Sequence, residues 1–293
     1  MGHPGDLTRR RQDAVLGWWV ARQRDLPWRR TRDPWAVLVC EVMAQQTQVA
    51  RVAERWPVFL ERFPTPAACA AAPVADVLRL WSGLGYNRRA LALHRCATEV
   101  VERHGGALPS DLAALLALPG VGPYTARAVA AFAFELDHGI VDTNTARVLA
   151  RWTGHSLGSR AVQAAADEVV PAGESWGWNQ AMLDLGATVC RRRVPDCEEC
   201  PVLDLCSWAQ AGWPPPDPAD GTAGVSVTQS RFDGSDRQGR GRLVEALRVG
   251  AVAREDLAPT MGWPDDPARA ERVAATVVAD GLALEEDGRY RLP

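Results

Sequence analysis

Apolar positions recur three and four residues apart along most of the chain between residues 12 and 210. Examples are Ala14, Val15, Trp18 and Trp19; Val37, Leu38 and Val42; and Ala126, Val129, Ala130 and Ala133. This spacing places the apolar side chains on one face of a helix, and clusters of Pro or Gly separate one run from the next. The alternation typical of strands is scarce. We therefore expect residues 1–210 to form an all-α domain.

The pattern changes after residue 210. Residues 211–236 are rich in Pro and Gly and are expected to be a linker with a stiff start and a flexible end. Residues 237–293 then hold two amphipathic stretches, RGRLVEALR and ARAERVAATVVADG, followed by LALEEDGRYRL, which predicts two short strands around an Asp287–Gly288 turn. Two helices and a β-wing predict a small C-terminal α/β module of winged-helix-like type. A small stabilising appendage is the alternative.

Composition and charge narrow the possible partners. The 293 residues carry 33 basic and 36 acidic side chains, a net charge of -3, and every basic residue is an arginine. This net negative charge argues against a protein whose whole surface is positive for binding nucleic acid. Arginines nevertheless cluster locally, as at Arg191, Arg192 and Arg193. No apolar run is long enough to cross a membrane, and the first residues have no apolar signal-peptide segment. We expect a cytoplasmic protein with no membrane partner.

Four of the seven cysteines lie close together in the loop 190–206. Cys190, Cys197, Cys200 and Cys206 are separated by six, two and five residues. A disulfide framework is not expected in the reducing cytosol, which leaves a metal. Zinc sites commonly use two separated close pairs, whereas four thiolates from one loop suit a [4Fe-4S] cube. The spacing favours the cluster and leaves zinc open; either metal would have a structural role.

Two glycines interrupt an apolar run at LPGVGPYTARAV, residues 118–129. Gly120 and Gly122 are either punctuation between two helices or a turn whose backbone N–H groups hold a phosphate at a helix N-terminus. Tyr124 follows directly, and it is either a core aromatic or a residue of the site beside the turn.

Residues 12–210 resemble the helix-hairpin-helix DNA glycosylases that carry an iron-sulfur cluster, and among them the adenine DNA glycosylases of the MutY type. The resemblance rests on LPWR, EVMAQQTQV, LWSGLGY, LPGVGPYTA, VDTNTARVLAR, NQAMLDLGATVC and the cysteine loop, in the family's order. It implies a two-lobed helix-hairpin-helix fold, a [4Fe-4S] cluster on the four cysteines, and double-stranded DNA with a mispaired or damaged base as the partner. A nucleoid-associated monomer is expected.

By the same resemblance, Glu41 is the general acid that protonates adenine and Asp142 stabilises the cationic sugar. Breaking an N-glycosidic bond requires two carboxyl groups in different states. From the residues alone, Glu41 interrupts an apolar run on a predicted helix, which favours its protonated form; its alternatives are a helix-surface glutamate or an ion-pair partner. The alternative for Asp142 is a helix N-cap. Tyr124 stands where bifunctional relatives carry a Schiff-base lysine, and the chain has no lysine. We therefore expect a monofunctional enzyme.

The resemblance also implies residues that hold DNA. Gln46 and Tyr86 wedge into the base stack with Thr47 and Leu84 beside them, because a base inside a duplex must be turned out before reaction. The residues expected to line the adenine pocket are Trp28, Arg29 and Gln180, and Trp28 has ordinary core packing as its alternative.

Three departures from the family pattern concern the opposite strand and the reacting sugar. Ala44 replaces a usual leucine, Asn87 a usual tyrosine and Thr143 a usual glycine. The residues after Gln210 are also too few and too helical for the Nudix-like domain with which relatives recognise 8-oxoguanine. Adenine opposite 8-oxoguanine or guanine is the expected substrate. A mismatch thymine or uracil glycosylase and a non-catalytic lesion-binding protein are the alternatives.

Overall fold

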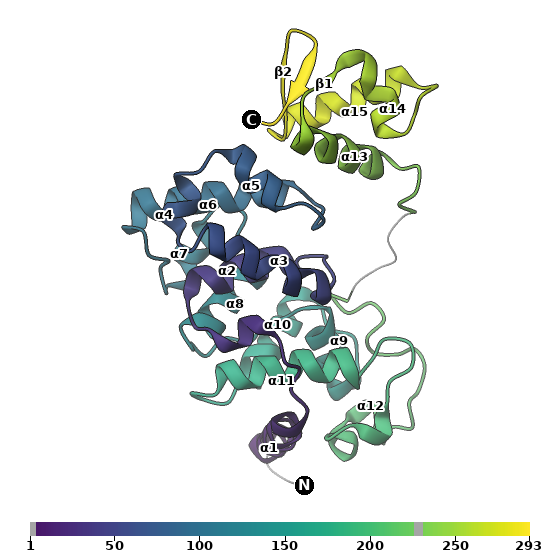
Figure 1. Cartoon of the computed structure of the whole chain (residues 1–293). Helices are drawn as coiled ribbons and strands as arrows, with labels where there is room; N and C mark the ends of the chain where they lie inside the picture. The colour runs from purple at the N-terminus through teal and green to yellow at the C-terminus, as the bar shows by residue number, and fades with distance from the viewer. Residues whose placement is uncertain (1–3, 226–230) are drawn as a thin grey trace. The chain divides into compact units, whose positions relative to one another are not determined.

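The computed structural model describes residues 4–225 and 231–293, and they are mainly helical (Figure 1). The chain divides into two compact units. The first contains Met1–Val37, Ser110–Leu112 and Gly122–Thr228, and the second contains Leu38–Pro109, Ala113–Val121 and Gln229–Pro293. The chain passes from one unit to the other several times, so residues 1–210 contribute to both. No helix in the described residues is long and apolar enough to span a membrane.

The first unit is built around tryptophan-rich packing of its longest helices. Its helices are α1 (Pro4–Arg22), η1 (Pro27–Arg30), α8 (Pro123–Ala133), α9 (Thr143–Thr153), α10 (Ser159–Glu168), α11 (Ser175–Thr188), η2 (Cys197–Glu199), η3 (Leu203–Leu205) and α12 (Ser207–Gln210). Helix α11 packs against α1, α8 and α9. The rings of Trp152 and Trp178 are 6.4 Å apart in this core, and Trp18 and Trp19 of α1 are buried in it.

Part of the predicted linker lies against the first unit. Asp217 forms an ion pair with the buried Arg151 at 2.6 Å, and Thr222 is buried where its Oγ1 accepts a hydrogen bond from the Leu157 N–H at 3.0 Å. Ala223 and Val225 pack against the same core.

The second unit contains a helical part and the C-terminal module. Its helices are α3 (Val49–Arg62), α4 (Pro66–Ala70), α5 (Val74–Leu80), α6 (Arg88–His104), α13 (Asp236–Val249), η4 (Arg254–Asp256), α14 (Leu257–Met261) and α15 (Pro267–Ala279). Helices α2 (Pro34–Ala44) and α7 (Leu112–Ala117) begin in the first unit and end in the second. The Phe59 ring meets the rings of Phe63 and Trp81 edge to face.

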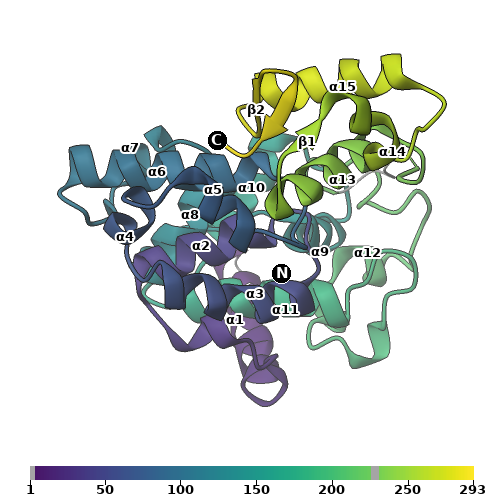
Figure 2. The ribbon, with the colours of Figure 1, turned by 45° about the horizontal axis from the view of Figure 1, so that its top comes forward.

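The C-terminal module combines α13, α14 and α15 with a small antiparallel sheet, as Figures 1 and 2 show. Strands β1 (Val252–Ala253), β2 (Leu284–Glu286) and β3 (Arg289–Arg291) lie in the order β1-β3-β2. Asp287 and Gly288 both have positive φ, 49° and 69°, as a type I′ hairpin turn requires. The hairpin agrees with the sequence pattern, but β1 and the short α14 were not foreseen.

Candidate functional site

Asp142 precedes α9 and caps its N-terminus. Its Oδ1 accepts hydrogen bonds from the backbone N–H groups of Asn144 at 2.8 Å and Thr145 at 2.7 Å, and its Oδ2 accepts from Asn144 Nδ2 at 2.8 Å. Burial raises the pKa of Asp142 above its ordinary value, while the hydrogen bonds from Thr145 and Asn144 act in the opposite direction. The N-cap interpretation is thus correct for this residue, and the cap fixes its carboxyl group in one orientation.

The segment that leads to Asp142 is held by Asn179, a buried residue of α11. Asn179 Oδ1 accepts from the Ile140 N–H at 2.9 Å, and its Nδ2 donates to the His138 carbonyl at 2.9 Å and the Ser175 carbonyl at 2.8 Å. All polar atoms of this buried amide are therefore occupied in positioning the backbone before Asp142. Asn179 was not among the predicted site residues, although the polar pair Asn179–Gln180 inside an apolar helix is a visible signal.

A second network runs from Asp142 to the cysteine loop. Asn144 Oδ1 accepts from Arg147 Nη2 at 2.8 Å, and Arg147 Nε donates to the Cys190 carbonyl at 2.6 Å. Arg147 is buried, and its Nη2 also donates to the Gly186 carbonyl at 2.6 Å. Arg147 therefore connects Cys190, the first cysteine of the loop, to Asn144, which donates to Asp142.

The first unit contains the three residues predicted to line the adenine pocket, Trp28, Arg29 and Gln180. Arg29 binds other side chains of the same unit. Its guanidinium makes two hydrogen bonds to Asp184, both 2.8 Å, and its Nε donates to Gln180 Oε1 at 2.7 Å. Burial would raise the pKa of Asp184, but its bonds to Arg29 and to Arg24 hold that pKa below its ordinary value. Arg29 thus positions Gln180, and Trp28 on η1 remains partly exposed.

Glu41 lies on α2 and is 7% exposed, with Val42 and Met43 buried beside it. It is therefore not a helix-surface glutamate. Burial raises the pKa of the neighbouring Cys40 well above its ordinary value. Glu41 belongs to the second unit, whereas Asp142 and Tyr124 belong to the first. The two predicted catalytic carboxyl groups thus come from different units.

The glycine turn joins α7 to α8 as a helix-hairpin-helix. Gly120 has φ +77°, and a Cβ there would lie 2.6 Å from the Ala92 Cβ, so only glycine fits the turn against α6. Gly122 is the N-cap of α8, and Tyr124 is partly exposed on the first turn of that helix. Both glycines are exposed, which leaves the backbone of the turn accessible.

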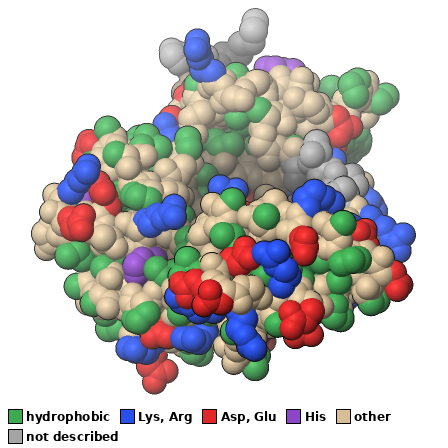
Figure 3. Space-filling model, turned by 90° about the horizontal axis from the view of Figure 1, so that it is seen from above, with side chains coloured by type: hydrophobic (Ala, Val, Ile, Leu, Met, Phe, Trp, Pro, Cys, Tyr) green, Lys and Arg blue, Asp and Glu red, His purple; other side chains and the backbone are tan. Residues whose placement is uncertain are grey.

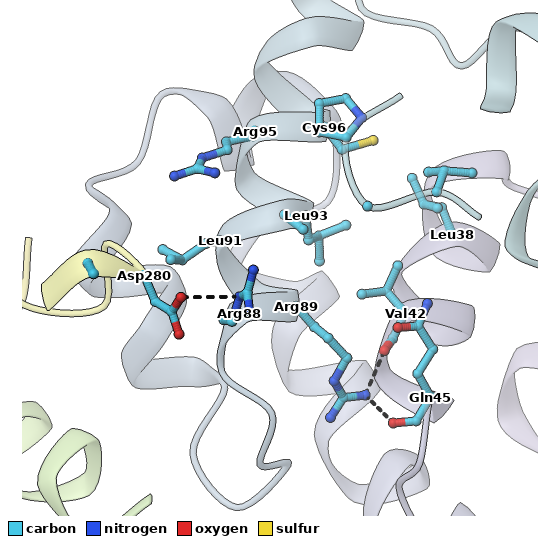
Figure 4. A pocket seen from close by; sticks show the side chains of 15 residues that line it. Leu38, Val42, Gln45, Arg88, Arg89, Leu91, Leu93, Arg95, Cys96 and Asp280 are labelled. Carbon is cyan, nitrogen blue, oxygen red and sulfur yellow. Dashed lines mark hydrogen bonds and ion pairs between the residues drawn. The ribbon is translucent and has the colours of Figure 1, made fainter. Parts of the chain in front are cut away.

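A cavity of about 430 Å³ adjoins the Gly120 side of the turn within the second unit. Figure 4 shows its floor on α6, with Arg88 directed toward Asp280 of the C-terminal module, 3.7 Å away, and Arg89 directed toward backbone oxygens near Val42 and Gln45. The hairpin and the C-terminal module therefore border the same space.

The two residues predicted to wedge into DNA, Gln46 and Tyr86, and the two predicted to lie beside them, Thr47 and Leu84, all belong to the second unit. Gln46 and Tyr86 are exposed and have the left-handed backbone that non-glycine residues rarely adopt, with φ of 53° and 45°. Thr47 Oγ1 donates to the Leu84 carbonyl at 3.3 Å, which joins the two turns beneath these side chains. Leu84 is buried.

Arg89 fastens the same two turns, although nothing in the sequence pattern distinguishes it from the other arginines. It donates to the Val42, Met43 and Gln45 carbonyls on one side, at 2.6 to 2.8 Å, and to the Leu84 and Gly85 carbonyls and Thr47 Oγ1 on the other, each at 3.0 Å. Burial lowers the pKa of Arg89 to about 10. Arg89 therefore fixes the backbone that presents Gln46 and Tyr86.

The four clustered cysteines converge on one small cavity in the first unit. Cys190, Cys197, Cys200 and Cys206 all line it, whereas the three isolated cysteines are buried elsewhere. Arg151 Nη1 donates to Cys190 Sγ at 3.3 Å, and Arg191, Arg192 and Arg193 are exposed on the loop. Across the described residues, no group of three or more His, Cys, Asp or Glu side chains is arranged to hold a metal ion.

Comparison with known proteins decides the family. A model of the HhH-GPD superfamily of base excision DNA repair proteins matches residues 39–172. The chain is 43% identical over 289 residues to the adenine DNA glycosylase of Mycobacterium tuberculosis H37Rv, with 95% of this chain and 92% of that protein aligned. The chain belongs to the adenine DNA glycosylases of the HhH-GPD superfamily. The adenine DNA glycosylase of Mycolicibacterium smegmatis is 40% identical, covering 95% of this chain and 94% of its own.

Among solved structures, a thermostable thymine-DNA glycosylase has the same fold, with a TM-score of 0.66 and 30% identity over 71% of this chain and 98% of its own. The mycobacterial adenine DNA glycosylases align over 95% of this chain, a share that requires most of residues 231–293. The C-terminal module therefore has a counterpart in those adenine DNA glycosylases.

Proposed function

We propose that this chain is a monofunctional DNA glycosylase that hydrolyses the N-glycosidic bond of adenine mispaired with 8-oxoguanine or guanine. The observation that carries the proposal is the contrast between Glu41 and Asp142. Glu41 is buried on an apolar helix, and Asp142 is fixed by three hydrogen bonds. Such a contrast supplies an acid for the departing base and a carboxylate for the developing cation.

In the proposed reaction the Glu41 carboxylic acid gives its proton to N7 of adenine, and the bond between C1′ and N9 breaks with both electrons leaving on the base. The Asp142 carboxylate, held by Asn144 and Thr145, stabilises the sugar cation. Water then adds its hydroxide to C1′, and its remaining proton returns to Glu41. The products are free adenine and an intact strand with an abasic sugar.

The absence of lysine supports the monofunctional assignment. Tyr124 lies on the first turn of α8, at the position where the family's bifunctional members carry the amine nucleophile. A side-chain Schiff base cannot form without that amine. Borohydride treatment of protein mixed with a mispaired duplex should therefore trap no covalent complex, and a strong trapped band would refute this part of the proposal.

Binding of the turned-out adenine is proposed for Trp28 and Gln180. Because Gln180 Oε1 already accepts from Arg29, its amide N–H groups are the ones left to donate to ring nitrogens of the base. Gln46 and Tyr86 fill the space in the stack, supported by Thr47 and Leu84. The backbone N–H groups of Gly120 and Gly122 hold a phosphate of the same duplex. One copy of the chain binds each duplex.

The cysteine cavity is proposed to hold a [4Fe-4S] cluster. Four thiol groups on one cavity provide the donor set of such a cube, whose ligands lie farther apart than those of a single ion. The cluster would cross-link the loop and thereby present Arg191, Arg192 and Arg193. The C-terminal module is proposed to be winged-helix-like, since a three-stranded antiparallel sheet accompanies its helices.

A mismatch thymine or uracil glycosylase is the second candidate, because the thymine-DNA glycosylase structure shares the fold at 30% identity. Glu41 and Gln180 favour adenine, since a purine leaving group needs the acid. The test is a panel of duplexes holding A:8-oxoG, A:G, T:G or U:G, followed by alkali. Breaks at the adenine support the proposal. Breaks only at T or U would establish the second candidate. Binding of a duplex without any break would indicate a lesion-binding protein.

A further inference from the structure

A cavity rich in arginine lies within the second unit, between the C-terminal module and the two turns that carry Gln46 and Tyr86. Its volume is about 660 Å³, and it is lined by residues of the segments 45–51 and 84–89 and by residues from Phe232 onward. Five of its 15 lining residues are arginines, and none of those lining residues within the described chain is acidic. The whole chain, by contrast, has more acidic than basic residues.

One face of α13 forms the module's side of the cavity. The lining residues of this helix follow the spacing of a single helix face: Arg237, Arg240, Gly241 and Val244. The helix is fixed in rotation, because a Cβ at Gly239 would lie only 2.1 Å from the Trp263 ring. The face that carries Arg237 is thus set by packing inside the module.

Helix α13 is also attached to the turn that carries Tyr86. The side chain of Arg248 is 8% exposed, and it donates to the Leu78 carbonyl and to Asn87 Oδ1, both at 2.8 Å. Ser82 Oγ donates to Glu245 Oε1 at 2.8 Å. Asn87, one of the departures from the family pattern, therefore accepts a hydrogen bond from the C-terminal module.

The arginines of the cavity differ in their partners. Arg89 points inward to carbonyl oxygens, and Arg240 and Arg88 share the Asp280 carboxylate. The side chain of Arg88 is nevertheless 74% exposed. Arg237 lies over the Phe232 ring, 5.9 Å from its centroid, and Phe232 is 55% exposed. The lining contributes five guanidinium groups and no carboxylate among the described residues, which makes the cavity positive.

Aromatic side chains border this positive cavity on both sides. Tyr86 is 45% exposed on one wall, and Phe232 is exposed on the other. Basic and acidic side chains are mixed over the face of the molecule drawn in Figure 3. The cavity differs from such a mixed surface by combining guanidinium groups with two exposed rings. This combination matches a nucleic-acid strand, whose phosphates pair with arginine and whose bases stack on aromatic side chains.

We propose that this cavity binds the backbone of a DNA strand, with Arg237 and Arg88 on its phosphates and Phe232 stacked on a base. The C-terminal module is then a second DNA-binding element, joined to the wedge turns by Arg248. The inference rests on the proposed function only in taking DNA as the ligand, and it assigns no part of the excision chemistry to the module.

The test compares Arg237→Glu with Arg289→Glu, an equal charge reversal on the exposed wing strand β3, which does not line the cavity. The affinity of each full-length protein for an A:G duplex and for an undamaged duplex is measured by fluorescence anisotropy over a range of salt concentrations. Adenine release is measured separately with protein in saturating excess. Binding to undamaged DNA reports on the cavity even if no adenine is released, so failure of the proposed function is distinguishable.

We expect Arg237→Glu to weaken binding at low salt about tenfold or more and to reduce the slope of log affinity against log salt by about 1. Adenine release at saturation should stay within about twofold. Phe232→Ala, a change at an exposed side chain, should weaken binding about fivefold. If both variants bind both duplexes as tightly as Arg289→Glu does, the proposal is wrong, whatever the melting temperature of Arg237→Glu.

Discussion

Arg29 and Asp184 form a bidentate ion pair inside the first unit, with Nη1 to Oδ2 and Nη2 to Oδ1 both 2.8 Å long. The Asp184 side chain is fully buried and that of Arg29 is 6% exposed. The remaining Nε of Arg29 donates to Gln180. The pair therefore connects the stability of the fold to the orientation of a proposed base-binding residue.

Asp184→Asn should lower the free energy of unfolding by about 3–5 kcal/mol, because it leaves the buried Arg29 charge uncompensated. Urea denaturation measures the change. Asp25→Asn is the matched control, since Asp25 and its partner Arg30 are both largely exposed, and that change should cost less than about 1 kcal/mol. Equal effects of the two substitutions would contradict this account.

The same pair predicts a dependence of stability on pH. The pKa of Asp184 is lower in the folded chain than its ordinary value of 3.8, so its ionised form stabilises the fold. This contribution is complete above pH 3.8 and is lost as the pH falls through the lower, folded pKa. Acid titration of the unfolding free energy should show less loss in Asp184→Asn than in the wild-type chain over that interval. An unchanged titration would argue against the pair.

Asp142→Asn should separate the capping role of Asp142 from its charge. Asparagine caps helices as well as aspartate does, so the unfolding free energy should change by less than about 0.5 kcal/mol. Adenine release should fall by at least about 100-fold, because the cationic sugar loses its counter-charge. Asp142→Ala should lose the cap as well and cost about 1 kcal/mol more. Retained release in Asp142→Asn would exclude the proposed role.

The pH profile of adenine release tests the same carboxyl group. Burial raises the pKa of Asp142 above 3.8, and the ionised form is the one proposed to act. The single-turnover rate should therefore fall on the acid side with a midpoint above pH 3.8. A rate that stays flat to below that value would show that ionised Asp142 is not required.

Arg89→Ala should release the two turns that carry Gln46 and Tyr86. Several carbonyl groups lose their donor at once, and the unfolding free energy should fall by about 2–3 kcal/mol. DNA binding should weaken as well. Arg103→Ala on the same helix is the control, since its side chain is 73% exposed. Hydrogen exchange confined to residues 44–47 and 84–86 should rise only in Arg89→Ala, and an equal rise in both would contradict the assignment.

Cys197→Ser should abolish the proposed cluster. Purified wild-type chain should contain about four irons and four sulfides, whereas the variant should lack both and melt at a lower temperature. Cys40→Ala removes a thiol outside the loop and should keep its iron. Zinc in place of iron in the wild-type chain would instead favour the alternative metal.

The helices and the hairpin at Asp287–Gly288 follow from periodicity and turn chemistry, which act within a few residues. The partners of polar side chains that lie far apart in the sequence do not follow from such local patterns. Arg248 meets Leu78, which lies 170 positions earlier, and Arg29 meets Asp184, 155 positions later. Nothing local distinguishes these arginines from exposed ones. The sequence therefore points to Asp142, Gln46 and Tyr86 as candidates but could not reveal which residues hold them in place.

The most direct test of the central claim is single-turnover release of adenine from an A:8-oxoG duplex by the wild-type chain, Glu41→Gln and Asp142→Asn. We predict that the wild-type chain releases adenine and that its strand breaks only after alkali. Glu41→Gln should be slower by about 100-fold to 10,000-fold, as expected when a general acid is removed. Wild-type rates in both variants, or strand breaks without alkali, would contradict the account.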